Sequence, residues 1–406
     1  MSDARQVAEA AARASYGRLV ALLASRTRDI AAAEDALSEA FATALRVWPE
    51  RGVPDKPEAW LLTTARRELS HTARAASVRA SAQHLIELAS AHAVQPDNTA
   101  FPDDRLKLLF VCAHPAIDAG IRTPLMLQTV LGLDASRIAA AFVVAPSAMG
   151  QRLVRAKTKI RDSGLEFRIP DCDERATRLA DVLQAVYAAF STGWDDVSGA
   201  DDTVRGLSGE AIFLGRLLVA LMPREPEPKG LLALMLYCEA RRPARRCRDG
   251  GFVPLRTQDT RLWSRDMIIE AEGLLTSASR AKIFGRFQCE AAIQSVHCQR
   301  SVTGRTHWPA LIRLYDLLAH HETTLGVLVS RAAVIATSGD AALAKQSLNQ
   351  LPIERIDSYQ PYWVTRAYVY RQLADHKGAR DAARRAISLT HDPAVRAYLS
   401  ETYKVR

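Results

Sequence analysis

Residues 125–161 constrain the fold most, because they hold two short helical patterns separated by a break that leaves room only for a tight turn. The first pattern includes Ser136 and residues 138–140 and begins after Asp134, whose carboxylate can accept hydrogen bonds from free backbone N–H groups. Pro146 follows the break and suits the first turn of a new helix, where its missing N–H is not needed. The spacing predicts a helix-turn-helix.

The second predicted helix, residues 147–161, is apolar on one side and basic on the other. Its apolar positions recur every three or four residues and are expected to be buried: they are Met149, Leu153, Ala156 and Ile160. From residue 144 to residue 161 the chain has five basic residues and no acidic one. This pattern is typical of a helix in a DNA major groove, although a surface helix with a solvated basic face is the alternative.

Roles for individual side chains follow from that geometry. Early residues of such a helix lie near base edges and later cations lie near phosphates. We therefore expect Gln151, Arg152 and Arg155 to set sequence preference. Lys157 and Lys159 point outward in this prediction and add salt-dependent affinity for phosphates. Ser147 caps the helix or touches a phosphate.

Composition supports an all-α chain with an anionic partner. Hydrophobic residues make up 48% of the 406 residues and aromatic residues only 6%, a composition that favours helices over strands. The net charge of +9 favours a partner such as nucleic acid. No long uncharged apolar run predicts a membrane span, and the polar, Ala-rich start has no signal-peptide core, so we expect a cytoplasmic protein.

Cysteine spacing and motif searches predict neither a cofactor nor a catalytic centre. Six scattered cysteines without a CxxC pair indicate reduced thiols. Cys289, His297 and Cys298 come nearest to a metal-binding pattern, but their spacing is loose for zinc, and we expect no metal site. No P-loop, GxSxG or HExxH motif is present, so the sequence does not predict an enzyme.

Residues 4–48 read as two helices with a polar corner at residues 25–29. One face of the second helix carries the apolar residues that we expect to be buried: Ala33, Leu37, Phe41 and Leu45. Asp35 and Glu39 are four residues apart and are therefore neighbours on the helix surface. Like charges there are tolerated on a solvated face and are useful where a basic partner surface docks.

A Pro-rich loop, residues 49–57, precedes a third predicted helix over residues 58–71. Trp60 stands beside two leucines at the start of that helix, and a Trp in such a setting packs inward. From Arg105 an apolar stretch predicts a support helix under the helix-turn-helix, and residues 114–115, His-Pro, mark its end.

Motifs in residues 33–66 and in residues 138–157 resemble those of extracytoplasmic-function (ECF) sigma factors of the sigma-70 class. Those that match sigma region 4, which reads the promoter −35 element, are Ile138-Ala139, Val144-Ala145-Pro146 and Arg152-Leu153-Val154-Arg155-Ala156-Lys157. Those that match region 2, which holds the polymerase and the −10 element, are Ala33-Glu34-Asp35, Glu39, Phe41, Ala59-Trp60-Leu61 and Ala65-Arg66.

The resemblance implies partners and further site residues. It implies that Asp35 and Glu39 dock on the β′ clamp helices of core RNA polymerase, with the β subunit as a further contact. It places Trp60, Arg66 and Arg67 in the region that handles the −10 element of promoter DNA. Arg67 and His71 stand where the family most often has Asn and Asp.

About 235 residues follow the predicted DNA-binding half. They resemble signature stretches of an ECF group with a long C-terminal extension related to tetratricopeptide (TPR) repeats: Glu210-Ala211-Ile212, residues 231–236, residues 240–245 and Gln258-Asp259. Residues 338–344 are echoed by residues 373–379, which lie thirty-five positions later, close to the TPR period of about 34. Such repeats present a concave surface to proteins or peptides, which implies a partner of that kind.

The predicted organisation is all-α with four parts: region 2 over residues 1–75, a linker over 76–103, region 4 over 104–168 and the TPR-like extension over 173–406. The predicted function is promoter-specific transcription initiation, with activity controlled by the fused extension. Two other functions stay open at this point. One is a stand-alone helix-turn-helix regulator with a helical sensor domain, and the other is a TPR-like scaffold whose basic helix is incidental.

Overall fold

The computed structural model describes residues 2–77, 103–142, 144–195, 202–352 and 356–405. These residues form helices and no strand, which confirms the predicted all-α class, and one isolated bridge pairs Arg246 with Phe252. The chain divides into two compact units, Met1–Gly193 and Trp194–Arg406.

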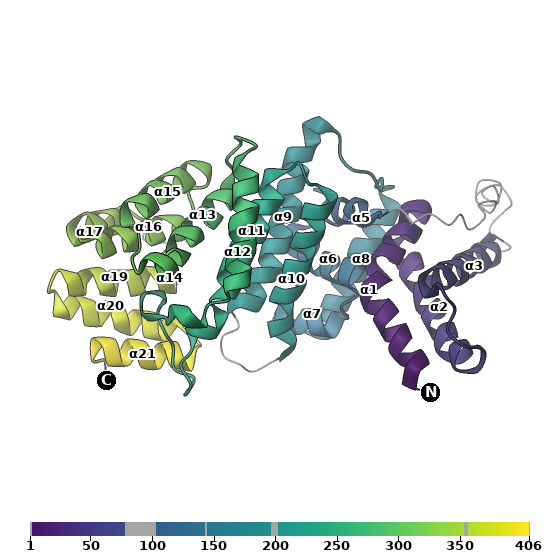
Figure 1. The fold of residues 1–406 in the computed structure, drawn as a ribbon, viewed down its shortest axis with the longest axis horizontal. Helices are drawn as coiled ribbons and strands as arrows, with labels where there is room; N and C mark the ends of the chain where they lie inside the picture. Colours follow the sequence, from purple (N-terminus) through teal and green to yellow (C-terminus); the bar gives the residue numbers. More distant parts are fainter. Residues whose placement is uncertain (1, 78–102, 143, 196–201, 353–355, 406) are drawn as a thin grey trace. The chain divides into compact units, whose positions relative to one another are not determined.

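The first unit contains the helices that bear the predicted site residues (Figure 1). They are α1 (Ser2–Thr27), α2 (Ile30–Arg51), α3 (Pro57–Ser77), α5 (Arg105–Cys112), α6 (Ala119–Leu131), α7 (Ala135–Ala141), α8 (Pro146–Asp162) and α9 (Cys172–Asp195). The last helix runs two residues past the end of the unit.

Helix α2 begins after Asp29 as predicted, but it runs to Arg51, three residues into the predicted loop, and its buried face matches the prediction only in part. Asp29 caps it by accepting a hydrogen bond from Ala32 N at 3.1 Å, and Gly52 ends it with a φ of +84° that disfavours other residues. The buried positions are Ile30, Ala33, Ala36, Leu37, Ala40, Ala44 and Trp48. Of the predicted apolar positions, Ala33 and Leu37 are buried, Phe41 is half-buried and Leu45 is 49% exposed, because the face that packs on α1 and α3 is centred on the alanines.

The predicted support helix is α5, and a second helix, α6, follows it. The break lies where the His-Pro pair predicts it, and the ring of His114 accepts a hydrogen bond from Ala116 N at 3.1 Å. Asp118 then caps α6 by accepting from Gly120 N at 2.9 Å. His114 is therefore a structural residue of the turn.

The predicted boundary after residue 168 lies inside the first unit, because α9 packs on α5 and α6. Arg122 pairs with Asp181 at 2.9 Å, and Thr123 Oγ1 donates to the carbonyl of Ala185 at 3.1 Å. Arg178 donates to the carbonyl of Phe110 at 2.7 Å. These bonds join α9 to α5 and α6, and the first unit extends to Gly193.

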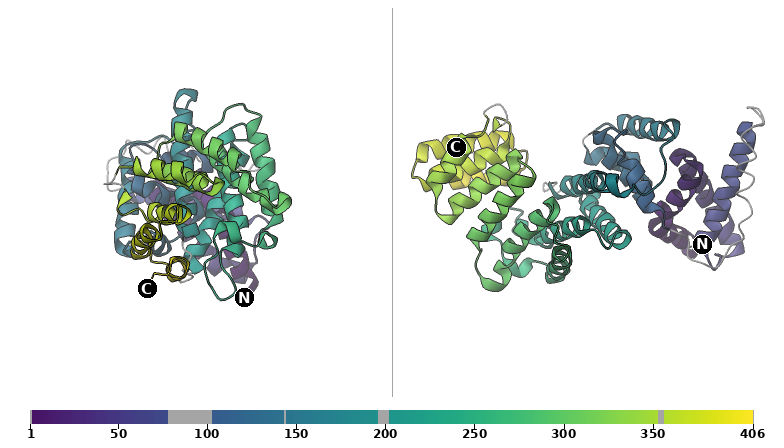
Figure 2. Two further views of the ribbon diagram at one scale, coloured as in Figure 1. Left: turned by 90° about the vertical axis from the view of Figure 1, so that its left-hand side faces the viewer. Right: turned by 90° about the horizontal axis from the view of Figure 1, so that it is seen from above.

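The second unit is built from helix pairs (Figure 2). Its α-helices are α10 (Asp202–Leu221), α11 (Pro226–Ala240), α12 (Arg265–Ser279), α13 (Arg286–Cys298), α14 (Arg300–Thr303), α15 (Trp308–His321), α16 (Leu325–Ser338), α17 (Ala341–Asn349), α19 (Gln360–Gln372), α20 (His376–Leu389) and α21 (Pro393–Tyr403).

The thirty-five-residue echo corresponds to two similar turns between helices, α16–α17 and α19–α20. In each turn a residue with positive φ, Gly339 or Ala374, precedes an Asp that caps the next helix. Asp340 accepts from Leu343 N at 2.9 Å and Asp375 from Gly378 N at 2.8 Å. The sequence echo is thus a repeated helical hairpin, while its relation to TPR proteins stays a prediction.

Candidate nucleic-acid interface

The predicted helix-turn-helix corresponds to helices α7 and α8. Asp134 accepts a hydrogen bond from Arg137 N at 2.9 Å at the start of α7. The turn is closed by a bond from Val144 N to the carbonyl of Ala139 at 3.0 Å, and Pro146 opens α8 as predicted. Ile138 and Ala139 are fully buried, so α7 crosses closely against α8.

The predicted apolar face of α8 is confirmed. Met149, Leu153, Ala156 and Ile160 are all buried. Because this face fixes the rotation of the helix about its own axis, it also fixes which polar side chains point outward.

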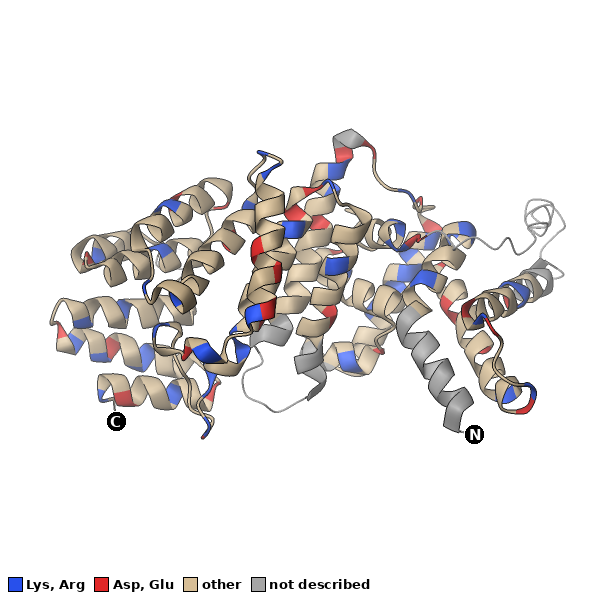
Figure 3. Ribbon diagram, in the orientation of Figure 1, with Lys and Arg blue, Asp and Glu red and all other residues tan. Residues whose placement is uncertain are grey.

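Three of the predicted DNA-contacting residues lie along the exposed face of α8 with Val154. Ser147, Gln151 and Arg155 are exposed, and the Val154 side chain is 62% exposed between them. Figure 3 shows basic residues, drawn blue, on this helix. Sequence reasoning missed Val154 because it assigns apolar residues to the core, yet the three-residue step from Gln151 places Val154 on the outer face.

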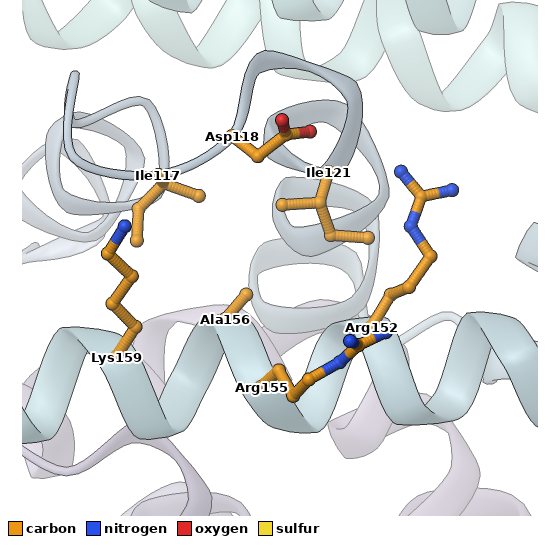
Figure 4. Close-up of a pocket in the computed structure, with 7 residues that line it drawn as sticks. All are labelled: Ile117, Asp118, Ile121, Arg152, Arg155, Ala156 and Lys159. Atoms are coloured by element: carbon orange, nitrogen blue, oxygen red, sulfur yellow. The ribbon is translucent and has the colours of Figure 1, made fainter.

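Arg152 and Lys159 lie on one edge of α8, beside α6. Nη2 of Arg152 donates to the carbonyl of Gly120 at 3.3 Å, and Arg152 is half-buried while Lys159 is exposed. Together with Arg155 they line a surface depression whose other lining residues are Ile117, Asp118, Ile121 and Ala156 (Figure 4). The side chain of Arg152 thus turns toward the start of α6.

The prediction for Lys157 is wrong, because its side chain is buried between α8 and α2. Its ammonium donates to the carboxylate of Glu34, and the two side chains are only 9% and 12% exposed. Burial raises the pKa of Glu34, and the positive charge of Lys157 opposes that rise. Lys157 is an internal ion-pair partner and is not available to a phosphate.

The first three helices and the helices from α5 onward meet at close range. A Cβ at Gly17 of α1 would lie 1.9 Å from the carbonyl oxygen of Val130 of α6, so only glycine fits there. Ser25 donates to Asp104 at 2.8 Å, and Arg161 lies 3.8 Å from Asp29. These contacts and the Lys157–Glu34 pair form one interface inside the first unit.

Asp35 and Glu39 project from α2 on the side opposite its buried face. Both side chains are exposed, and Glu39 lies 3.4 Å from Arg46, itself exposed. An exposed ion pair of this kind contributes little to stability, so either carboxylate is available to a partner. Glu34 precedes Asp35 in sequence but faces α8.

The residues predicted for the −10 region lie on α3 and differ in exposure. Trp60 is half-buried, and its ring lies edge-on against Trp48, with centroids 5.5 Å apart and the planes at 66°. Arg66 is half-buried, and burial lowers the pKa of its guanidinium, with Arg26 adding to the effect. Arg67 is exposed. Trp60 serves packing, as the sequence predicts, and Arg67 is open to solvent.

Neither metal-binding clusters nor membrane spans occur among the described residues. No group of three or more His, Cys, Asp or Glu side chains there could hold a metal ion, and no helix there is long and apolar enough to cross a membrane. Cys289 and Cys298 are buried, and burial raises the pKa of both thiols to about 12. They are core residues, with Cys289 Sγ donating to the carbonyl of Leu314 at 3.3 Å.

Comparisons with known proteins bear on both units. Residues 12–78 match the family described as Sigma-70 region 2, a range that holds α1 from residue 12 onward, α2 and α3, and residues 178–279 match a family of unknown function, DUF6596. An uncharacterized protein of Rhizobium meliloti is 35% identical over 378 residues, which are 92% of this chain and 89% of that relative.

A second group of relatives carries a functional name. The probable ECF RNA polymerase sigma factor SigI of Mycobacterium tuberculosis is 28% identical over 188 residues, which are 45% of this chain and 63% of SigI. No solved structure matches the chain.

Proposed function

We propose, from the premise that this chain belongs to the sigma-70 family of sigma factors, that it is an ECF-type factor that binds core RNA polymerase and directs promoter-specific initiation. The observation that carries the proposal is the pairing, in one compact unit, of the region 2 helices with a helix-turn-helix whose second helix exposes polar and basic side chains. A sigma factor needs both parts, one for the polymerase and one for the −35 element.

The test is initiation in a purified system. The full chain is combined with core polymerase, and the holoenzyme selects promoters from a random-sequence DNA pool; we expect a selected −35 and −10 pair and transcripts that start downstream of it. A stand-alone helix-turn-helix regulator would bind DNA without core enzyme and start no transcript. Absence of selection by the holoenzyme would count against a sigma factor.

Region 2 supplies the polymerase contact in this proposal. The exposed carboxylates of Asp35 and Glu39 bind basic residues of the β′ clamp helices. Arg67 is exposed and contacts the −10 element together with the half-buried Arg66, and Trp60 holds α3 on α2 through Trp48. Since polymerase and promoter share the cytoplasm, we place the protein there, without a cofactor.

Region 4 supplies −35 recognition through the exposed face of α8. Gln151 and Arg155 can each form two hydrogen bonds with a base edge, and Ser147 lies near the start of the helix, where phosphates approach. Val154 offers an apolar surface, which suits the C5-methyl group of thymine.

Removal of the Val154 methyl groups should cost as much as removal of the thymine methyl. We expect Val154→Ala to weaken holoenzyme binding to the selected −35 duplex by about 0.8 kcal/mol, roughly fourfold. Replacement of one thymine by deoxyuridine should cause the same loss in the wild type and little further loss in the variant. Equal deoxyuridine effects in both proteins, at every thymine, would show that Val154 reads no methyl group. Binding curves on paired duplexes provide the measurement.

The second unit, with its helical hairpins, controls activity in this proposal and offers a surface to a protein or peptide. A domain tethered in cis acts at an effective concentration in the millimolar range for short linkers, so weak contacts with the first unit are sufficient. We favour a requirement for the extension over simple inhibition.

A fragment that ends at Gly193 should keep α9 on α5 and α6 and therefore keep its helical fold. We expect this fragment to bind core polymerase but to initiate at least several-fold less than the full chain. A fragment cut at Pro170 is the control, since loss of α9 should lower its melting temperature. Equal transcription by the full chain and by the Gly193 fragment, at equal folded concentration, would exclude control by the second unit.

A further inference from the structure

We infer that the depression between the start of α6 and α8 binds one phosphate of the DNA backbone, and that Arg152 contacts this phosphate and not a base edge. The inference deepens the proposed function and rests on it, because it assumes that α8 enters the major groove. It changes the role that the sequence predicts for Arg152.

The depression is built from two rigid elements. Arg152, Arg155 and Lys159 reach it from α8, and Ile117, Asp118 and Ile121 border it from the first turn of α6 and the loop before it (Figure 4). Ile117 and Ile121 are buried and belong to the core of the first unit. The floor is therefore fixed by packing, and an incoming group meets a preformed site.

The charges around the depression fit a single phosphate. Three cations line it against one carboxylate, which leaves a net charge of +2 (three minus one). Asp118 Oδ1 is engaged by Gly120 N at 2.9 Å as the cap of α6. The side-chain ammonium of Lys159 has no hydrogen bond or ion pair to any residue that the structure describes. A backbone phosphate, with one negative charge, would accept bonds from these cations.

Arg152 lies on the edge of α8 and not on its outer face. Arg152 and Lys159 are seven residues apart, which is about two helical turns, so both lie on the edge beside α6. The Arg152 guanidinium reaches toward the carbonyl of Gly120, at 3.3 Å, away from Gln151. A guanidinium in this place meets the wall of a groove, where the phosphates run, while Gln151 meets its floor.

The opposite edge of α8 has its positive charge neutralised within the protein. Lys157 pairs with Glu34, and Arg161 lies 2.8 Å from Asp162 and 3.8 Å from Asp29. The two edges of α8 therefore differ. The cations on the edge beside α2 are paired with carboxylates of the protein, while the cations on the edge beside α6 can bind an anion from outside. This asymmetry predicts that strong phosphate contacts of α8 fall on one DNA strand.

The test uses the holoenzyme and the −35 duplex that the wild type selects from a random pool. Each phosphate is replaced in turn by an uncharged methylphosphonate, and the affinities of the wild type and Arg152→Ala are measured over a range of salt concentrations. We expect one position, or two adjacent ones, where the replacement weakens the wild type roughly tenfold and the variant little. The salt slope of the variant should fall by about 0.9.

Two further variants separate a phosphate contact from base recognition. Arg152→Lys keeps a charge that can bind phosphate and should restore most of the salt slope. Gln151→Ala should lower discrimination between selected and scrambled −35 duplexes but keep the sensitivity to the methylphosphonate. A changed base preference in Arg152→Ala, with no phosphate position coupled to it, would overturn the inference. Failure of the wild type to select any −35 sequence would instead remove the proposed function.

Discussion

Replacement of Asp35 and Glu39 by lysine should abolish holoenzyme formation while the chain stays folded. Both carboxylates are exposed on α2 and neither supports the core. If they meet basic residues of the β′ clamp helices, the double change places like charges opposite each other, which costs several kcal/mol, roughly a hundredfold or more in affinity. Titration of labelled core polymerase measures the loss.

A charge-matched control accounts for the general effect of raising the net charge by four. Glu50 and Asp55 are also exposed, and the variant Glu50→Lys/Asp55→Lys changes the net charge by the same amount. It should bind core polymerase within about twofold of the wild type, as is usual for charges outside an interface. If both double variants bind core polymerase with the same affinity, whether both keep it or both lose it, the polymerase does not dock on the Asp35–Glu39 face. Circular dichroism of each variant confirms the fold.

Features set by local chemistry were predictable from the sequence. The start of α7 at Asp134, the start of α8 at Pro146 and the apolar face around Leu153 follow from capping and periodicity, which act within a few residues. The Asp-capped hairpins at Asp340 and Asp375 are of the same kind. These rules place a side chain inward or outward, but they do not name its neighbour.

Features set by a second helix were not predictable from one helix alone. From α8 alone, Lys157 is expected to point outward, but it forms an ion pair with Glu34 of α2. Arg152 is expected to contact a base, but its guanidinium donates to the Gly120 carbonyl of α6. Leu45 is exposed because α1 and α3 pack on the alanine stripe of α2. In each case the partner lies far away in sequence, and no local pattern encodes the pairing.

Breaking the buried Lys157–Glu34 pair should cause the largest loss of stability that we expect in the first unit. Lys157→Met keeps the apolar part of the side chain but leaves Glu34 as an unpaired buried charge. Breaking one partner of such a pair typically costs about 3–5 kcal/mol. Urea unfolding of the fragment that ends at Gly193 reports this unit without the second one. Lys159→Met is the matched control: this exposed side chain has no partner among the described residues, and its loss should change stability by no more than about 0.5 kcal/mol.

The pH dependence of the Lys157→Met loss identifies its cause. In the variant the Glu34 carboxylate keeps its burial and loses the ammonium that opposes the rise of its pKa. Because the folded-state pKa of this acid is raised above the unfolded value, the destabilisation is full at pH values above the folded pKa. It shrinks as the pH falls toward the ordinary range of a glutamic acid, where Glu34 becomes neutral. A loss that stays constant from neutral to acidic pH would instead point to altered packing around residue 157.

Removal of both charges should then recover most of the stability. In Glu34→Leu/Lys157→Met two apolar side chains of similar volume replace the pair, a change that is neutral or stabilising in other buried pairs. We expect the double variant to unfold within about 1 kcal/mol of the wild type, far above the single variant, which a double-mutant cycle measures directly. If instead the two losses add, Lys157 and Glu34 do not stabilise the unit through each other. Recovery would mean that the pair sets which faces of α2 and α8 meet and leaves the overall stability to the surrounding apolar core, in which Leu37 and Leu153 are buried.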